Sequence, residues 1–130
     1  MYFDRRGRLC DAEFYHDRRR QDHYRRVGLT QVGRFTVSTV WLGIDHNPNN
    51  FAWQDGQEWY EFDWERSPPH IFETTIWPTC IVARRYSSLV YAVWGHDEVV
   101  LELESAMRGH FPNGDVPTTN EITDDGADEQ

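Results

Sequence analysis

The apolar run RFTVSTVWLGI at residues 34–44 constrains the fold more than any other part of the chain. Successive side chains of a β-strand point to opposite faces of its sheet. Both faces of this run carry large apolar side chains, namely Phe35, Val37 and Trp41 on one and Val40, Leu42 and Ile44 on the other. Such a pattern is typical of a strand that is covered on both sides. It therefore predicts that residues 34–44 form a central strand.

The same run ends in an unusual group of polar residues. Gly43 and Ile44 are followed by Asp45, His46 and Asn47, which place an acid, an imidazole and an amide side by side. Asp and Asn often stabilise turns through hydrogen bonds to nearby backbone amides, which is one interpretation. The alternative is that these compact hydrogen-bonding groups form part of a ligand pocket at the end of the strand. We expect the pocket, with the turn as the competing interpretation.

Two β-hairpins are predicted from alternating side chains and turn residues. Residues 23–31 alternate, and Gly33 separates them from the run at 34–44, which predicts a first hairpin. Residues 70–77 and 80–86 flank Pro78 and Thr79 and predict a second hairpin. The polar segment at 11–22 predicts a short N-terminal helix.

A long C-terminal helix is predicted after the second hairpin. Ser87 or Ser88 can cap it, and it extends to about residue 108. Side chains spaced by three and four residues form one inward stripe, which consists of Leu89, Val93, His96, Val100, Leu103 and Met107. The predicted fold class is therefore α+β, in which an antiparallel sheet of about four strands packs against this helix.

A single domain at residues 1–110 is expected, because a chain of 130 residues has room for one core. Residues 47–69 are predicted to form an acidic loop with large aromatic side chains, which are Phe51, Trp53, Trp59, Tyr60, Phe62 and Trp64. Such a loop must pack on the domain, contact another subunit or cover a ligand. Residues 111–130 are acidic and lack periodicity, which predicts a disordered tail.

Composition narrows the classes of function. The chain has 22 acidic and 13 basic residues, a balance that argues against an extended nucleic acid as partner. Every basic residue is arginine, which excludes mechanisms that need a lysine nucleophile or Schiff base. Cys10 and Cys80 are too few for a cysteine-rich zinc site. Neither a signal segment nor a membrane span is evident, so we expect a cytoplasmic protein without membrane contact.

The residue pattern favours binding over catalysis. No HxxxH or CxxC pair, calcium loop, Gly-rich phosphate loop or nucleophile elbow occurs, so we predict no catalytic residues, metal ligands or cofactor. Arginine can still donate to two phosphate oxygens, and an aromatic ring can stack on a base. The expected ligand-binding residues are Trp41, Asp45, His46, Asn47, Glu73, Arg85, Tyr86 and His96.

Several of these candidates also have a purely structural interpretation. Arg85 can form an ordinary surface ion pair, and Trp41 can belong to the core because it lies on a central strand. His96 lies in the middle of the helix stripe and can be a satisfied buried histidine. For any single residue of these types, the structural role is the more common one.

Short motifs in this chain carry a resemblance to a known family: VSTVWLGIDHN, IFET, RRYSS and GH, in this order. They resemble the S-T-V-W-L-G-x-D-H, P-P-x-I-F-E-T, R-Y-S-T and E-A-x-x-G-H motifs of a family of small bacteriophage proteins. The segments YFDRRG and YRRVGLTQVG look like the N-terminal part of its actinobacterial-phage members. The pattern is similar to that of the Thoeris anti-defence sponge proteins, which capture the cyclic ADP-ribose signal made by a bacterial TIR-domain enzyme.

This resemblance implies an oligomer in the host cytoplasm that encloses a cyclic nucleotide between a β-sheet and C-terminal helices without hydrolysing it. The chain departs from the family pattern in the aromatic loop, in Tyr91-Ala92 in place of the E-A pair, and in Ile76-Trp77 in place of a Met-Val-Phe-like sequence. These departures leave the ligand open. Sequestration of a cyclic ADP-ribose-type signal is the expected function. The alternatives are a phage-encoded acidic inhibitor that binds a host protein and a small metal-dependent hydrolase.

Overall fold

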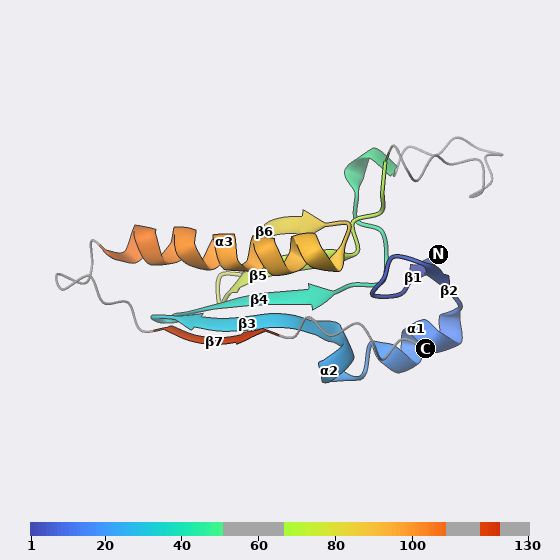
Figure 1. Ribbon diagram of the computed structural model, residues 1–130, viewed down its shortest axis with the longest axis horizontal. Helices are drawn as coiled ribbons and strands as arrows, with labels where there is room; N and C mark the ends of the chain where they lie inside the picture. The colour runs from blue at the N-terminus through green and yellow to red at the C-terminus, as the bar shows by residue number, and fades with distance from the viewer. Residues whose placement is uncertain (51–66, 109–117, 123–130) are drawn as a thin grey trace.

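A five-stranded antiparallel sheet is the main element of the computed structural model, which describes residues 1–50, 67–108 and 118–122 (Figure 1). The strand order is β6-β5-β4-β3-β7. The strands are β3 (Arg26–Val32), β4 (Phe35–Trp41), β5 (Phe72–Trp77), β6 (Ile81–Tyr86) and β7 (Thr118–Ile122). One long helix, α3 (Leu89–Met107), packs against this sheet. The predicted α+β class, both hairpins and the C-terminal helix are therefore confirmed.

β4 is the middle strand of the sheet, as its apolar run predicts. The side of β4 that faces α3 holds the fully buried Val37, Thr39 and Trp41. The prediction that both sides of this strand are covered is wrong, because Val40 is only half-buried and Ile44 is exposed. Thr36 and Ser38 share this second side, which makes its first half polar enough to remain partly in water.

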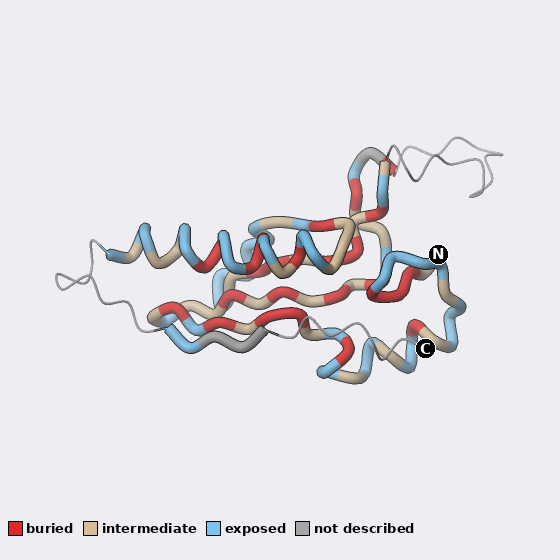
Figure 2. Tube along the Cα trace, viewed as in Figure 1, coloured by how far each residue is buried: buried red, intermediate tan, exposed pale blue. Residues whose placement is uncertain are grey.

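α3 begins at the predicted cap, since the Ser88 hydroxyl accepts a hydrogen bond from the backbone amide of Tyr91 at 3.2 Å. The helix contacts β3, β4, β5 and β6, and Figure 2 shows its buried segments on the side toward the sheet. The predicted stripe lies on this side, with His96 and Val100 buried and Leu89, Val93, Leu103 and Met107 half-buried. Within the described ranges, no helix has both the length and the apolar character needed to cross a bilayer.

The N-terminal segment packs at one end of the sheet (Figure 1). It contains β1 (Tyr2–Phe3), β2 (Leu9–Cys10), α1 (Ala12–Arg18) and α2 (Asp22–Arg25). The short helix predicted at 11–22 is confirmed as α1, and a second short helix, α2, follows it. The break between them brings Tyr24 into the core, edge-on to Trp41 with ring centroids 4.9 Å apart. Because α2 occupies residues 22–25, the strand predicted from residue 23 begins later, at Arg26.

β7 contradicts the predicted disordered tail (residues 111–130) at Thr118–Ile122, and the rest of that tail lies outside the described residues. Thr118–Ile122 pairs antiparallel with β3, with Thr118 opposite Val32 and Ile122 opposite Gly28. The Thr118 hydroxyl also donates to Glu104 of α3 at 2.7 Å. Backbone pairing with the edge of β3 holds this strand in the sheet. A prediction from composition does not detect such pairing, because it considers only the residues of the segment itself. The domain boundary at residue 110 stays a prediction, and most of the aromatic loop predicted at 47–69, residues 51–66, lies outside the described residues.

Candidate ligand-binding site

The predicted ligand-binding residues lie in three separate places. Asp45, His46 and Asn47 follow β4, next to residues 67–70. Glu73 and Arg85 are paired across β5 and β6. Trp41, Tyr86 and His96 belong to the core. The structure therefore does not bring all of these side chains into one pocket.

Asp45 joins the two segments that flank residues 51–66 in the sequence. Its Oδ1 accepts hydrogen bonds from the backbone amides of Asn47 at 2.8 Å and His70 at 2.9 Å. Its Oδ2 accepts from the side-chain amide of Asn50 at 2.6 Å. The backbone amide of His46 also donates to the His70 carbonyl at 2.9 Å. Both carboxylate oxygens of Asp45 are thus occupied within the protein, which is a structural role.

Asn47 and its neighbours complete this arrangement. The Asn47 side chain donates to the Ser67 hydroxyl at 3.2 Å, and that hydroxyl donates to Asn50 Oδ1 at 2.5 Å. The Nδ1 of His46 donates to the Ile44 carbonyl at 2.9 Å. We call this set the Asp45 clasp, which consists of Asp45, Asn47, Asn50, Ser67 and His70. The geometry favours the turn interpretation of Asp45-His46-Asn47, because their contacts fasten the chain before residue 51 to the chain after residue 66.

His96 is the centre of a buried polar chain between α3 and the sheet. Its Nε2 lies 2.8 Å from the Thr30 hydroxyl, and its Nδ1 lies 2.7 Å from the Thr39 hydroxyl. The chain continues from Thr39 to Thr74 at 2.5 Å and from Thr74 to the Tyr86 hydroxyl at 2.9 Å. We call these five residues the Thr-His-Tyr network. Burial lowers the pKa of His96, and Asp97 opposes this shift. The lowered pKa favours the neutral imidazole, which can donate a hydrogen bond at one nitrogen and accept one at the other.

Two glycines allow this network to pack closely. A Cβ added at Gly28 would lie 2.9 Å from Nδ1 of His96, and one added at Gly95 would lie 2.1 Å from Cε1 of Tyr86. Contacts this short leave no room for a side chain at either position. The Gly95-His96 pair is therefore explained by packing, since Gly95 admits the Tyr86 ring and His96 links the helix to the sheet.

Trp41 is also a core residue. Its side chain is 1% exposed, and its indole nitrogen donates to the Phe3 carbonyl at 3.0 Å. The ring packs against Tyr15 and Tyr24, with centroid distances of 5.8 Å and 4.9 Å. Trp41, Tyr86 and His96 are thus buried in the core, which favours the structural interpretation of Trp41 and His96.

Glu73 and Arg85 are the accessible pair among the candidates. They lie on the sheet face opposite α3, since the neighbouring Arg84 points to α3 and binds Glu98 there at 2.7 Å. The Nε of Arg85 donates to Glu73 Oε2 at 3.0 Å, and Glu73 Oε1 accepts from the Thr75 hydroxyl at 3.1 Å. The Arg85 side chain is 36% exposed, and its terminal amino groups have no hydrogen-bond partner among the described residues. Glu73 thus orients a guanidinium whose outer edge is available.

His70 lies beside this pair, and the sequence-based prediction did not include it. The backbone amide of His70 belongs to the Asp45 clasp. The backbone amide of Ile71, the next residue, donates to the Tyr86 carbonyl at 2.9 Å, and this bond places His70 close to Arg85. Burial lowers the pKa of the His70 imidazole; Asp45 opposes the shift, and Arg85 adds to it. The sequence signal was available, because His70 lies two residues before β5 and the end of β4 must lie beside the start of β5. We call Glu73, Arg85 and His70 the Arg85 site.

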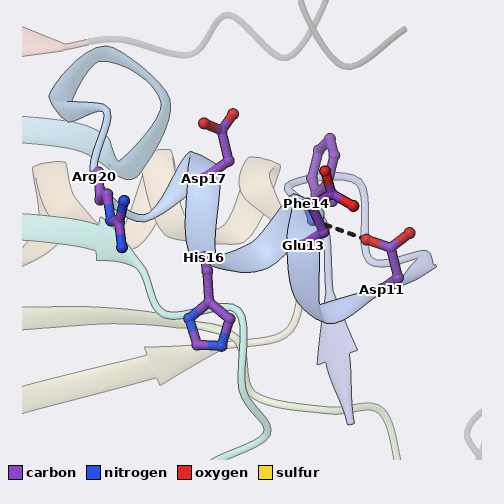
Figure 3. Close-up of a pocket in the computed structure, with 6 residues that line it drawn as sticks. All are labelled: Asp11, Glu13, Phe14, His16, Asp17 and Arg20. Atoms are coloured by element: carbon purple, nitrogen blue, oxygen red, sulfur yellow. Dashed lines mark hydrogen bonds between the residues drawn. The ribbon is translucent and has the colours of Figure 1, made fainter.

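A shallow hollow of about 540 Å³ on α1 is a weaker candidate (Figure 3). It is lined by Asp11, Glu13, Phe14, His16, Asp17 and Arg20. Asp11 already caps α1 by accepting from the Phe14 amide at 2.8 Å, and Asp17 accepts from Gln21 at 3.0 Å. In Figure 3, His16 and Asp17 point in opposite directions. The excess of acids repels a phosphate. Nowhere in residues 1–50, 67–108 and 118–122 are three His, Cys, Asp or Glu residues grouped to hold a metal ion.

Comparison with protein-family models, curated proteins and solved structures finds no significant match to this chain.

Proposed function

We propose that this protein binds and sequesters a cyclic nucleotide signal of the cyclic ADP-ribose type, as a bacteriophage anti-defence protein that does not cleave its ligand. The observation that carries the proposal is the partly exposed side chain of Arg85, which Glu73 orients and His70 flanks. A cyclic ADP-ribose isomer carries a pyrophosphate, and a guanidinium is well suited to bind two phosphate oxygens at once.

The contacts of Glu73, Arg85 and His70 within the Arg85 site fit an anionic ligand. Glu73 engages the Nε of Arg85, so among the described residues both terminal amino groups remain for the ligand. His70 can add a second donor, and its protonated form also supplies positive charge. This local arrangement allows anion binding by a chain whose formal net charge is −9. Sequestration needs only such binding groups and no activated nucleophile.

The motifs that resemble the sponge family support the proposal in a second way. Each of the motifs VSTVWLGIDHN, IFET, RRYSS and GH contributes at least one residue to the Thr-His-Tyr network or the Asp45 clasp, namely Thr39, Asp45, Asn47, Thr74, Tyr86 and His96. Between them these two sets of contacts fix the positions of Glu73, Arg85 and His70. The predicted stacking of Trp41 or Tyr86 on an adenine is not part of the proposal, because both rings are buried.

The alternative proposal, an acidic inhibitor that binds a host protein, is favoured by a different observation. Large apolar side chains are exposed on the solvent side of α3, among acidic residues. This surface is separate from the Arg85 site, on the other side of the sheet. The third alternative, a metal-dependent hydrolase, finds no structural support within the described residues.

The proposal is tested with a panel of cyclic ADP-ribose isomers and cyclic oligonucleotides. A ligand that binds only the folded state raises the melting temperature, and at a concentration of 100 times Kd it adds about 2.7 kcal/mol of stability. Heating the complex should release the same molecule intact, whereas a hydrolase would release a product. Arg85→Ala should abolish the stabilisation, while Arg25→Ala, which removes an exposed arginine paired with Asp22, should retain it. If no member of the panel raises the melting temperature, the proposal is wrong.

A further inference from the structure

The solvent side of α3 carries large apolar side chains that the fold does not use. Val90, Tyr91, Trp94 and Leu101 are 56%, 57%, 61% and 61% exposed, respectively. Val90, Trp94 and Leu101 lie on one side of the helix, because they are spaced by four and seven residues. The opposite side of α3 already fills the core through Ala92, His96 and Val99. A row of exposed apolar side chains of this size is typical of an interaction surface.

A small hollow lies at the start of this row. Its volume is about 200 Å³, and it is lined by Leu89, Val90, Val93 and Trp94, all of which are apolar. Sites for small molecules usually measure roughly 300–1,000 Å³ and contain a few polar groups that orient the ligand. This hollow is smaller and has no polar side chain in its lining. It fits one apolar side chain of a larger partner better than a free metabolite.

The charge of α3 specifies the partner further. The helix carries Asp97, Glu98, Glu102 and Glu104 and has no lysine or arginine from Leu89 to Met107. Arg84 binds Glu98 and Glu102, whose side chains nevertheless remain 61% and 65% exposed. Two α3 helices packed against each other would bring like charges together. Charge complementarity therefore favours a basic partner over a second copy of this helix.

We propose that the outer face of α3 docks a basic amphipathic helix of a partner protein. One apolar side chain of that helix fills the hollow beside Trp94, and a second covers Leu101. Arginine or lysine side chains of the partner lie against Asp97 and Glu98. This surface lies on the other side of the sheet from Arg85, so docking does not require the proposed nucleotide ligand.

The test uses the full chain and a fluorescently labelled helical peptide of leucine and lysine, about 18 residues long so that it spans five helical turns. Fluorescence anisotropy should show saturable binding that weakens with added salt. Trp94→Ser should weaken binding about tenfold or more, because exposed aromatic anchors dominate such interfaces. Trp77→Ser is the matched control, since Trp77 is 46% exposed on β5 and lies outside this surface; it should bind like the unchanged protein.

Three results would overturn the proposal. The first is equal binding of a matched peptide in which glutamate replaces lysine, because the acidic residues of α3 would then not select a basic partner. The second is an equal effect of Trp94→Ser and Trp77→Ser, which would indicate non-specific adhesion. The third is a dimer of the protein alone, seen by sedimentation and lost in Trp94→Ser, which would assign this face to a second copy. Thermal melts of both variants verify that they remain folded.

Discussion

The two faces of the sheet use polar side chains in opposite ways. On the face toward α3, the Thr-His-Tyr network is buried, and each of its links is within hydrogen-bond distance. On the opposite face, Glu73 and Arg85 form an ion pair that is partly open to solvent. The first arrangement needs no further group, whereas the second leaves the outer edge of a guanidinium available. One face therefore builds the fold and the other can serve a ligand.

Neighbouring residues of one motif divide between these faces. In IFET, Glu73 belongs to the open face, and the next residue, Thr74, belongs to the buried network. In RRYSS, Arg84 binds α3, and Arg85 faces the other way. A strand motif thus mixes structural and ligand-facing residues at alternate positions. Resemblance to such a motif predicts a fold more reliably than it predicts which residues bind.

Removal of His96 should produce the largest effect on stability. His96→Ala breaks the network at its centre and leaves a cavity under α3, which should lower the free energy of unfolding by about 3 kcal/mol. Urea denaturation measures this loss. His46→Ala is the control, because its ring makes one hydrogen bond to a carbonyl at a half-buried position and should cost less than about 1 kcal/mol. Equal losses in the two variants would contradict the special role of the buried network around His96.

Asp45→Ala should produce the next largest effect. The change leaves the amides of Asn47 and His70 without their acceptor and opens the Asp45 clasp, so we expect a loss of about 2 kcal/mol. Asp22→Ala, which removes an exposed carboxylate paired with Arg25, should change stability by less than about 0.5 kcal/mol. If Asp45→Ala instead melts like the unchanged protein but loses ligand binding, Asp45 contacts the ligand and the turn interpretation is wrong.

Matched changes on β4 compare the two faces directly. Thr39→Val removes a hydroxyl that bonds both His96 and Thr74, and should cost about 1–2 kcal/mol. Thr36→Val removes a hydroxyl on the opposite side whose one partner among the described residues is the exposed Gln31, and should change stability by less than about 0.5 kcal/mol. Thermal or urea unfolding of both variants gives the comparison. A larger loss for Thr36→Val would reverse the proposed roles of the two faces.

The fold was largely predictable because its signals are local. Apolar alternation predicted β4 as a central strand, and the stripe around His96 predicted the face of α3 that meets the sheet. β7 was not predictable in this way, since Thr118–Ile122 has no strong pattern and is held by pairing with β3. The candidate site was predictable only in part. The sequence placed Glu73 and Arg85 among eight candidates, but which candidates are buried depends on packing. His70 was missed although it lies just before β5.

The pH dependence of stability should show a smaller effect. Burial lowers the pKa of His96 and of His70, so below about 6.5, the ordinary histidine pKa, the unfolded chain binds more protons than the folded one. Stability should therefore be constant from pH 8 to about pH 7 and fall as the pH drops further, by at most about 1.4 kcal/mol per unit for His96. Denaturation at pH 7.5 and at about pH 5.5 measures the difference. His96→Ala should show a weaker pH dependence, and an unchanged one would assign the effect to other groups.

Arg85→Ala should have the smallest effect on stability and the largest on binding. A partly exposed ion pair contributes little, so unfolding should change by less than about 0.5 kcal/mol, while the stabilisation by a nucleotide ligand should disappear. Arg85→Lys keeps the charge but not the paired donors, and should restore only part of the binding.

Ligand binding should also strengthen as the pH falls toward 5.5, because protonated His70 attracts an anion. The protein itself becomes less stable over the same range of pH. Ligand affinity measured at both pH values separates these opposite trends. If affinity falls together with stability as the pH drops, His70 does not contact the ligand. For the Arg85→Ala variant, a loss of folding stability as large as that of Thr39→Val would show that the open face is also structural.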